Sequence, residues 1–112
     1  MSLRLTALLL ALIPTLAALP AWADDAPAAA AQELGRLNGT ALACGHREVA
    51  NRIKYLMIQK SPKTPTFGNA FEAATQEAFV ARTRDAAPCP EAPELARQAE
   101  VAAERLPNPE AR

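Results

Sequence analysis

The stretch Ser61-Pro62-Lys63-Thr64-Pro65 (SPKTP) divides the part of the chain that is patterned for helices. Its two prolines remove backbone donors and push the residues before them into extended geometry, so no helix is expected to continue across it. Thr64 followed by Pro65 has the residue types of a helix N-cap and first helical position. The stretch therefore predicts that one helix ends before it and that another starts at its end.

Apolar residues recur at helical spacing on both sides of this turn. Steps of three and four predict a helix over residues 40–60 before the turn, a second over residues 66–85 after it, and a shorter third over residues 94–106. The sequence Asn-Gly-Thr at residues 38–40 indicates either a kink or the true start of the first helix. No window alternates as a strand does, so the predicted fold class is all-α.

The two cysteines lie near predicted helix ends that an antiparallel hairpin would bring close together. Cys89 sits in a second proline-rich breaker, residues 86–93, and Cys44 lies near the start of the first predicted helix. If residues 40–60 and 66–85 form an antiparallel hairpin, these two points are neighbours at its open end. Two cysteines in a small exported chain are typical of a disulfide, which here closes a loop of about 46 residues and contributes about 4 kcal/mol. The predicted fold is therefore a disulfide-clamped antiparallel helical hairpin plus a shorter third helix.

The N-terminus predicts export. Residues 1–23 combine a positive start, a short apolar segment and the sequence Ala-Trp-Ala, which is typical of a signal peptide cut after Ala23. The apolar segment is too short for a membrane anchor, so no stable membrane insertion is expected after cleavage. The remaining chain divides into an Ala-rich lead-in that is flexible or partly helical (residues 24–39), a helical domain (residues 40–106) and a polar tail (residues 107–112). A periplasmic or secreted location follows.

Composition argues against several classes of function. Eleven basic and twelve acidic residues remain after the predicted cut, which leaves a net charge of about −1 and no basic excess for nucleic acid or an anionic membrane. After the predicted cut, one histidine, one serine (Ser61, in the proline turn) and isolated glycines remain, and these offer no catalytic pair and no phosphate-binding loop. We therefore expect neither an enzyme nor a cofactor.

The sequence Cys44-Gly45-His46 raises the question of a metal site. On a helix, side chains two positions apart point about 200° away from one another, so Cys44 and His46 would not share an ion. A loop at Gly45 would permit such a chelate, but zinc needs about four ligands, and only Cys89 and carboxylates remain. His46 is thus expected to be a solvent-facing helix residue, and a periplasmic metal-binding protein that uses Cys44 and His46 is the second alternative function.

Protein–protein contact is the function that the remaining residues favour. Five large side chains are expected to form the core of the hairpin, and any part of them left uncovered would mark a homodimer seam or a groove for a partner helix. These residues are Tyr55, Met57, Phe67, Phe71 and Phe79, and Leu56 is expected beside them in the core. The expected function is that of a small exported adaptor, inhibitor or accessory subunit with an unknown protein partner.

In size, export signal, single disulfide and helical pattern, the chain resembles the small periplasmic acid-stress chaperones. The likeness is one of architecture and is carried by no motif, so it is an analogy. It implies the first alternative function, in which acid exposes apolar surface that guards unfolded client proteins.

Overall fold

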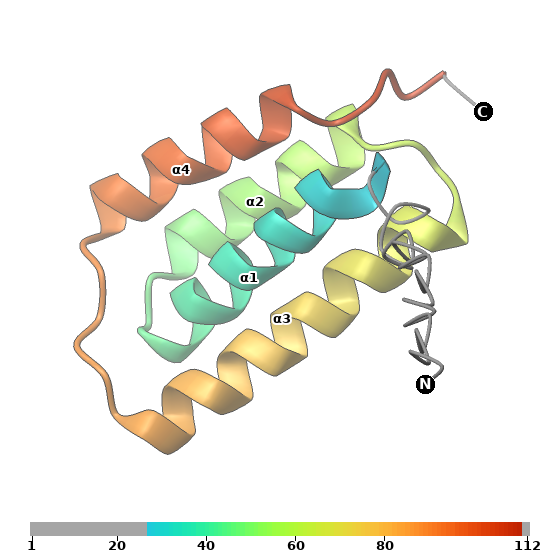
Figure 1. Cartoon of the computed structure of the whole chain (residues 1–112). Helices are drawn as coiled ribbons and strands as arrows, with labels where there is room; N and C mark the ends of the chain where they lie inside the picture. The colour runs from blue at the N-terminus through green and yellow to red at the C-terminus, as the bar shows by residue number, and fades with distance from the viewer. Residues whose placement is uncertain (1–26, 111–112) are drawn as a thin grey trace, which may run out of the picture.

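The computed structural model describes residues 27–110, which form four α-helices and no strand (Figure 1). The helices are α1 (Ala29–Ala43), α2 (Arg47–Lys60), α3 (Pro65–Asp85) and α4 (Ala92–Glu104). The all-α prediction is confirmed. The predicted signal peptide and its cut after Ala23 lie outside the described residues. Within residues 27–110, no helix combines the length and the apolar character that crossing a bilayer requires.

Much of the segment expected as an Ala-rich lead-in belongs to α1. The chain is helical from Ala29 on, and Leu34 and Leu37 are fully buried. Residues 38–40, where a kink or a helix start was predicted, continue α1 without a break. The helical domain therefore includes α1 and begins well before residue 40.

The single helix predicted over residues 40–60 is wrong, because the chain reverses at residues 44–46 between α1 and α2. Gly45 adopts a left-handed φ of +73°, which costs glycine little. The amide of His46 donates to the carbonyl of Ala41 at 2.8 Å, the bond that closes a Schellman C-cap. Apolar residues keep nearly helical spacing on both sides of this turn, so periodicity alone did not reveal it.

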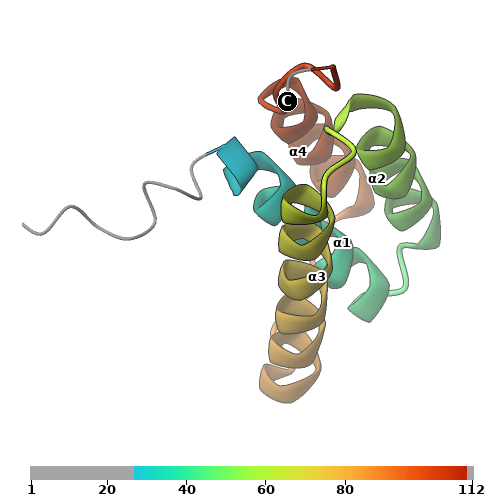
Figure 2. The ribbon, with the colours of Figure 1, turned by 90° about the vertical axis from the view of Figure 1, so that its right-hand side faces the viewer.

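α1 is the central helix of the molecule (Figures 1 and 2). α3 packs along one side of it, whereas α2 and α4 pack on the other side and also contact each other. No Cα atom of α2 lies within 8 Å of one in α3. The antiparallel pairing predicted between residues 40–60 and 66–85 is therefore not present. Instead α2 folds back on α1, and α3 runs parallel to α1.

Two glycines allow α1 and α3 to approach closely. A Cβ atom at Gly35 would lie 2.4 Å from the carbonyl oxygen of Phe71, and one at Gly39 would lie 2.2 Å from that of Thr75. Small residues four positions apart let helix backbones come together. This contact, rather than the proline turn, decides the partner of α3.

The predicted second and third helices are close to the observed ones. α3 begins at Pro65 with Thr64 as its N-cap in extended conformation, as the sequence indicated, and α4 overlaps the predicted segment 94–106. Apolar side chains from α1, α2 and α4 meet in the core. The most deeply buried large ones are Leu34, Leu37, Ile53, Leu56 and Leu95.

The predicted disulfide is confirmed. Cys44 and Cys89 are bonded, with their Cα atoms 5.7 Å apart. The bond joins the α1–α2 turn to the α3–α4 loop, at the end of the molecule opposite the linker between α2 and α3 (Figure 1). The turn at residues 44–46 thus replaces the helix start that was expected to carry Cys44.

Candidate partner-binding groove

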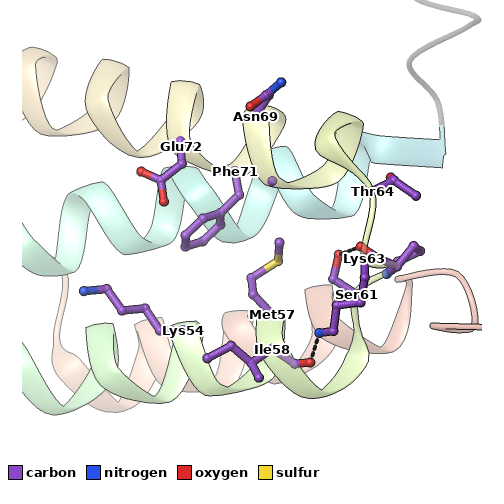
Figure 3. Close-up of a pocket in the computed structure, with 11 residues that line it drawn as sticks. Lys54, Met57, Ile58, Ser61, Lys63, Thr64, Asn69, Phe71 and Glu72 are labelled. Carbon is purple, nitrogen blue, oxygen red and sulfur yellow. Dashed lines mark hydrogen bonds between the residues drawn. The ribbon is translucent and has the colours of Figure 1, made fainter.

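A hollow of about 550 Å³ lies between α2, the α2–α3 linker and α3. Figure 3 shows Met57 and Ile58 of α2 and Phe71 of α3 among the side chains around it. Phe71 is buried and belongs also to the core cluster, while Met57 is half-buried. The hollow exists because α2 and α3 each pack on α1 without packing on one another.

A second hollow, of about 310 Å³, follows the first along α3. It is lined by Leu42 of α1 and by Thr75, Gln76, Phe79 and Val80 of α3. Gly68 and Glu72 of α3 line the first hollow, and Thr75 and Phe79 line the second. These four residues follow one another along α3 at steps of four, three and four. Such steps keep to one helix face. We refer to the two hollows together as the α3 groove.

Exposed apolar side chains concentrate in this groove. Among residues 27–110, six large apolar side chains are exposed. Four of them line the groove: Leu42, Ile58, Phe79 and Val80. Ile58 is 62% exposed and Phe79 is 42% exposed. The other two, Tyr55 and Val101, lie outside both hollows.

The hollow on the other side of the α1–α3 contact has a different character. Its volume is about 640 Å³, but its apolar lining is made of alanines. Arg36 and Glu33, which also line it, form an ion pair with each other at 2.6 Å. It offers no large apolar side chain as an anchor, so it is the weaker candidate.

Three charged side chains line the α3 groove. Lys54 lies on α2, Lys63 lies in the linker, and Glu72 lies on α3. The ammonium group of Lys63 donates to the carbonyl of Ile58 near the end of α2 (Figure 3). Ion pairs within residues 27–110 join other residues, so none of the three is paired with a protein charge.

The structure separates the five residues that the sequence grouped as one apolar stripe. Met57 and Phe71 line the first hollow and Phe79 lines the second. Phe67 is buried against the start of α1. Tyr55 is exposed on another face of α2, where its ring centroid lies 5.3 Å from the guanidinium carbon of Arg52.

Sequence reasoning missed three of the four exposed large apolar residues of the groove: Leu42, Ile58 and Val80. Ile58 directly follows Leu56 and Met57, so three successive apolar residues cannot all face one core on a helix. That run was a usable signal for an apolar side chain in solvent. Leu42 lies between two alanines and Val80 lies between Phe79 and Ala81, so neither carried a comparable signal.

The stretch around His46 is structural. Cys44 is disulfide-bonded, so its sulfur is not a free thiolate ligand. His46 is half-buried rather than solvent-facing, and its Nε2 atom donates to the carbonyl of Pro90 at 2.9 Å. Within residues 27–110, no three His, Cys, Asp or Glu side chains are grouped so that they could hold a metal ion. His46 therefore supports the same junction as the disulfide.

The shifted carboxylates lie on α4, away from the groove. Hydrogen bonds from Arg97 and Gln98 lower the pKa of Glu94 to about 2. A hydrogen bond from Arg52, at 2.6 Å, lowers the pKa of Glu100 and links α2 to α4. These are exposed pairs on a helix surface, which is a pattern of solvated ion pairing rather than of catalysis.

No family model matches the chain, and no curated protein or solved structure matches it. The geometry of the groove is therefore the basis for a functional proposal.

Proposed function

We propose that this is a small exported helical protein that acts by protein–protein contact, as an accessory, adaptor or inhibitor, and that the α3 groove is its contact surface. The observation that supports the proposal is the gathering of four of the six exposed large apolar side chains of residues 27–110 along this groove. Apolar side chains clustered in a concave surface mark interaction sites more often than single exposed ones do. Export is inferred from the sequence of residues 1–23.

The shape of the groove favours a protein segment as its occupant. The α3 residues that line it run from Gly68 to Val80, which corresponds to about 18 Å along a helix. Apolar side chains spread over that length, at positions one helical turn apart, suit the anchors of an amphipathic helix laid in the groove. Met57, which lines the first hollow, has a flexible thioether that adapts to a partner's side chains.

Site-specific photocrosslinking tests this proposal. A photoreactive residue replaces Ile58, within the groove, or Val101, which is exposed on α4 and lies outside it. In periplasm from cells that export the full chain, we expect a discrete protein adduct from position 58 and none from position 101. Phe79→Glu in the position 58 variant is expected to abolish the adduct.

Equal adducts from both positions, or none from position 58, would count against the groove as the contact surface. An adduct with the mass of two copies of this chain would identify the groove as a homodimer seam.

The acid-stress chaperone is the second candidate, and the Arg52–Glu100 pair is the observation that favours it. This exposed pair bridges α2 and α4, and protonation of Glu100 would remove one link between the two helices. We expect increased binding of an apolar dye near about pH 3 and suppression of client aggregation at that pH. Native packing that persists at that pH would rule this candidate out.

A further inference from the structure

The charges that line the α3 groove are unevenly distributed between its sides. Both cations, Lys54 and Lys63, lie on α2 and on the linker that follows it, whereas the single carboxylate, Glu72, lies on α3. Figure 3 shows Lys54 and Glu72 on opposite sides of the hollow, with Phe71 between them. A helix in the groove would therefore have a positive side chain along one flank and a negative one along the other.

The position of Lys63 is defined by the end of α2. Its ammonium group donates one hydrogen to the carbonyl of Ile58, which leaves two donors for a partner. Lys54 lies four residues before Ile58, so the two side chains share one face of α2. Lys54 and Lys63 thus flank the exposed apolar residue Ile58 in the sequence.

We propose that the occupant of the groove is an amphipathic partner helix whose apolar stripe is flanked by acidic residues on the side that faces α2. This inference rests on the proposed function. It adds the charge that the partner helix carries beside its apolar stripe and the side on which that charge lies. Oppositely charged residues beside an apolar seam select the partner and its orientation, as in paired helices that carry charges beside their contact stripe. Glu72 favours a neutral or basic residue on the other flank of the partner.

A second copy of this chain fits the groove less well. The groove is concave, so two grooves placed face to face would leave unfilled space between them, and packing requires a convex element. Outside the groove, the exposed large apolar side chains of residues 27–110 are Tyr55 and Val101, on different helices. Neither gives the stripe of anchors that the groove would accept.

The test uses two synthetic helical peptides of about 14 residues, long enough to span the groove. Both carry the same leucines on one face and glutamine on one flank. On the other flank, one peptide has glutamate and the second has glutamine. Binding of each peptide to the full mature chain is measured by fluorescence anisotropy at low salt, where exposed charges are least screened.

Lys54→Glu and Lys60→Glu form a matched pair of variants, because both residues are exposed on α2 but only Lys54 lines the groove. We expect Lys54→Glu to weaken binding of the glutamate peptide about tenfold and to leave binding of the glutamine peptide within about twofold. Lys60→Glu is expected to leave the affinity for both peptides within about twofold.

Three other outcomes would overturn the inference. Equal binding of the two peptides to the unmodified chain would overturn the acidic flank while leaving the groove as a binding surface. Absence of binding by either peptide, together with no photocrosslink at position 58, would overturn the proposed function as well. A dimer in sedimentation that Ile58→Glu dissociates would identify a second copy as the occupant and overturn the inference.

Discussion

At the scale of single residues, the three glycines in α1 and in the turn after it are required for two different reasons. Gly35 and Gly39 are required because the backbone of α3 lies where their Cβ atoms would be, whereas Gly45 is required because its φ is +73°. A fourth, Gly68, lies on α3 with nothing within 4 Å of a Cβ atom placed on it. Only the first two concern the pairing of α1 with α3.

Gly39→Ala is expected to destabilise the protein by about 1–3 kcal/mol, because the new methyl group overlaps the carbonyl oxygen of Thr75 and forces α1 and α3 apart. Gly68→Ala is the matched control, and it is expected to leave stability unchanged or to raise it by up to about 1 kcal/mol through helix propensity. Chemical denaturation followed by circular dichroism gives both free energies of unfolding. Similar values for the two variants would show that the close contact does not hold in solution.

At the scale of the helices, α2 has three different sides. One side packs in the core, a second carries Arg52 toward Glu100 of α4, and a third carries Ile58 along the α3 groove. The core side is the one that apolar spacing predicted. The other two depend on which helices stand next to α2, and the sequence does not show those neighbours.

The α2–α4 ion pair predicts a small dependence of stability on pH. Since the folded pKa of Glu100 is lowered from 4.5, its contribution is present above that pH and is lost as pH falls through the lower folded pKa. Glu100→Gln is expected to reduce the loss of stability that occurs below pH 4.5, by only a small amount because both side chains are exposed. Thermal melting between about pH 6 and pH 3 measures this.

Glu104→Gln is the control for that measurement, since Glu104 is an exposed carboxylate on the same helix without an ion-pair partner among residues 27–110. If the two variants have the same pH profile, the α2–α4 pair contributes nothing to acid stability.

At the scale of the whole molecule, the disulfide and the hydrogen bond of His46 hold one end together. Cys44 to Cys89 and His46 to Pro90 both connect the α1–α2 turn with the α3–α4 loop. α3 and α4 have no direct contact, so each is held through α1 and through this junction. The junction therefore limits how far α3 can move relative to the three-helix cluster of α1, α2 and α4.

Replacement of both cysteines by serine is expected to lower the free energy of unfolding by about 4 kcal/mol, because the bond closes a loop with a sequence separation of 45. Denaturation of the unmodified chain with and without a reducing agent should show the same loss. The reducing agent should have no effect on the double serine variant. An unchanged stability after complete reduction would contradict this account.

Local signals in the sequence were sufficient for two of the helix boundaries and for the disulfide, but not for the turn between α1 and α2. The prolines of residues 61–65 and 86–93 predicted two helix boundaries, and cysteine count with predicted export indicated the disulfide. Each of these signals acts through the backbone of its own neighbourhood or through bond formation, so no knowledge of packing was needed. The turn at Gly45 carried a local signal too, but the regular apolar spacing on both sides of it concealed the break.

The pairing of the helices and the α3 groove were decided only by the tertiary structure. Periodicity shows that a helix buries one face, but it does not show which helix covers that face. The contact of Gly35 and Gly39 with α3 draws α3 onto α1 and away from α2, and the space left between α2 and α3 becomes the groove. Phe79, which was expected in the core of a hairpin of residues 40–60 and 66–85, is exposed because α2 does not pack on α3.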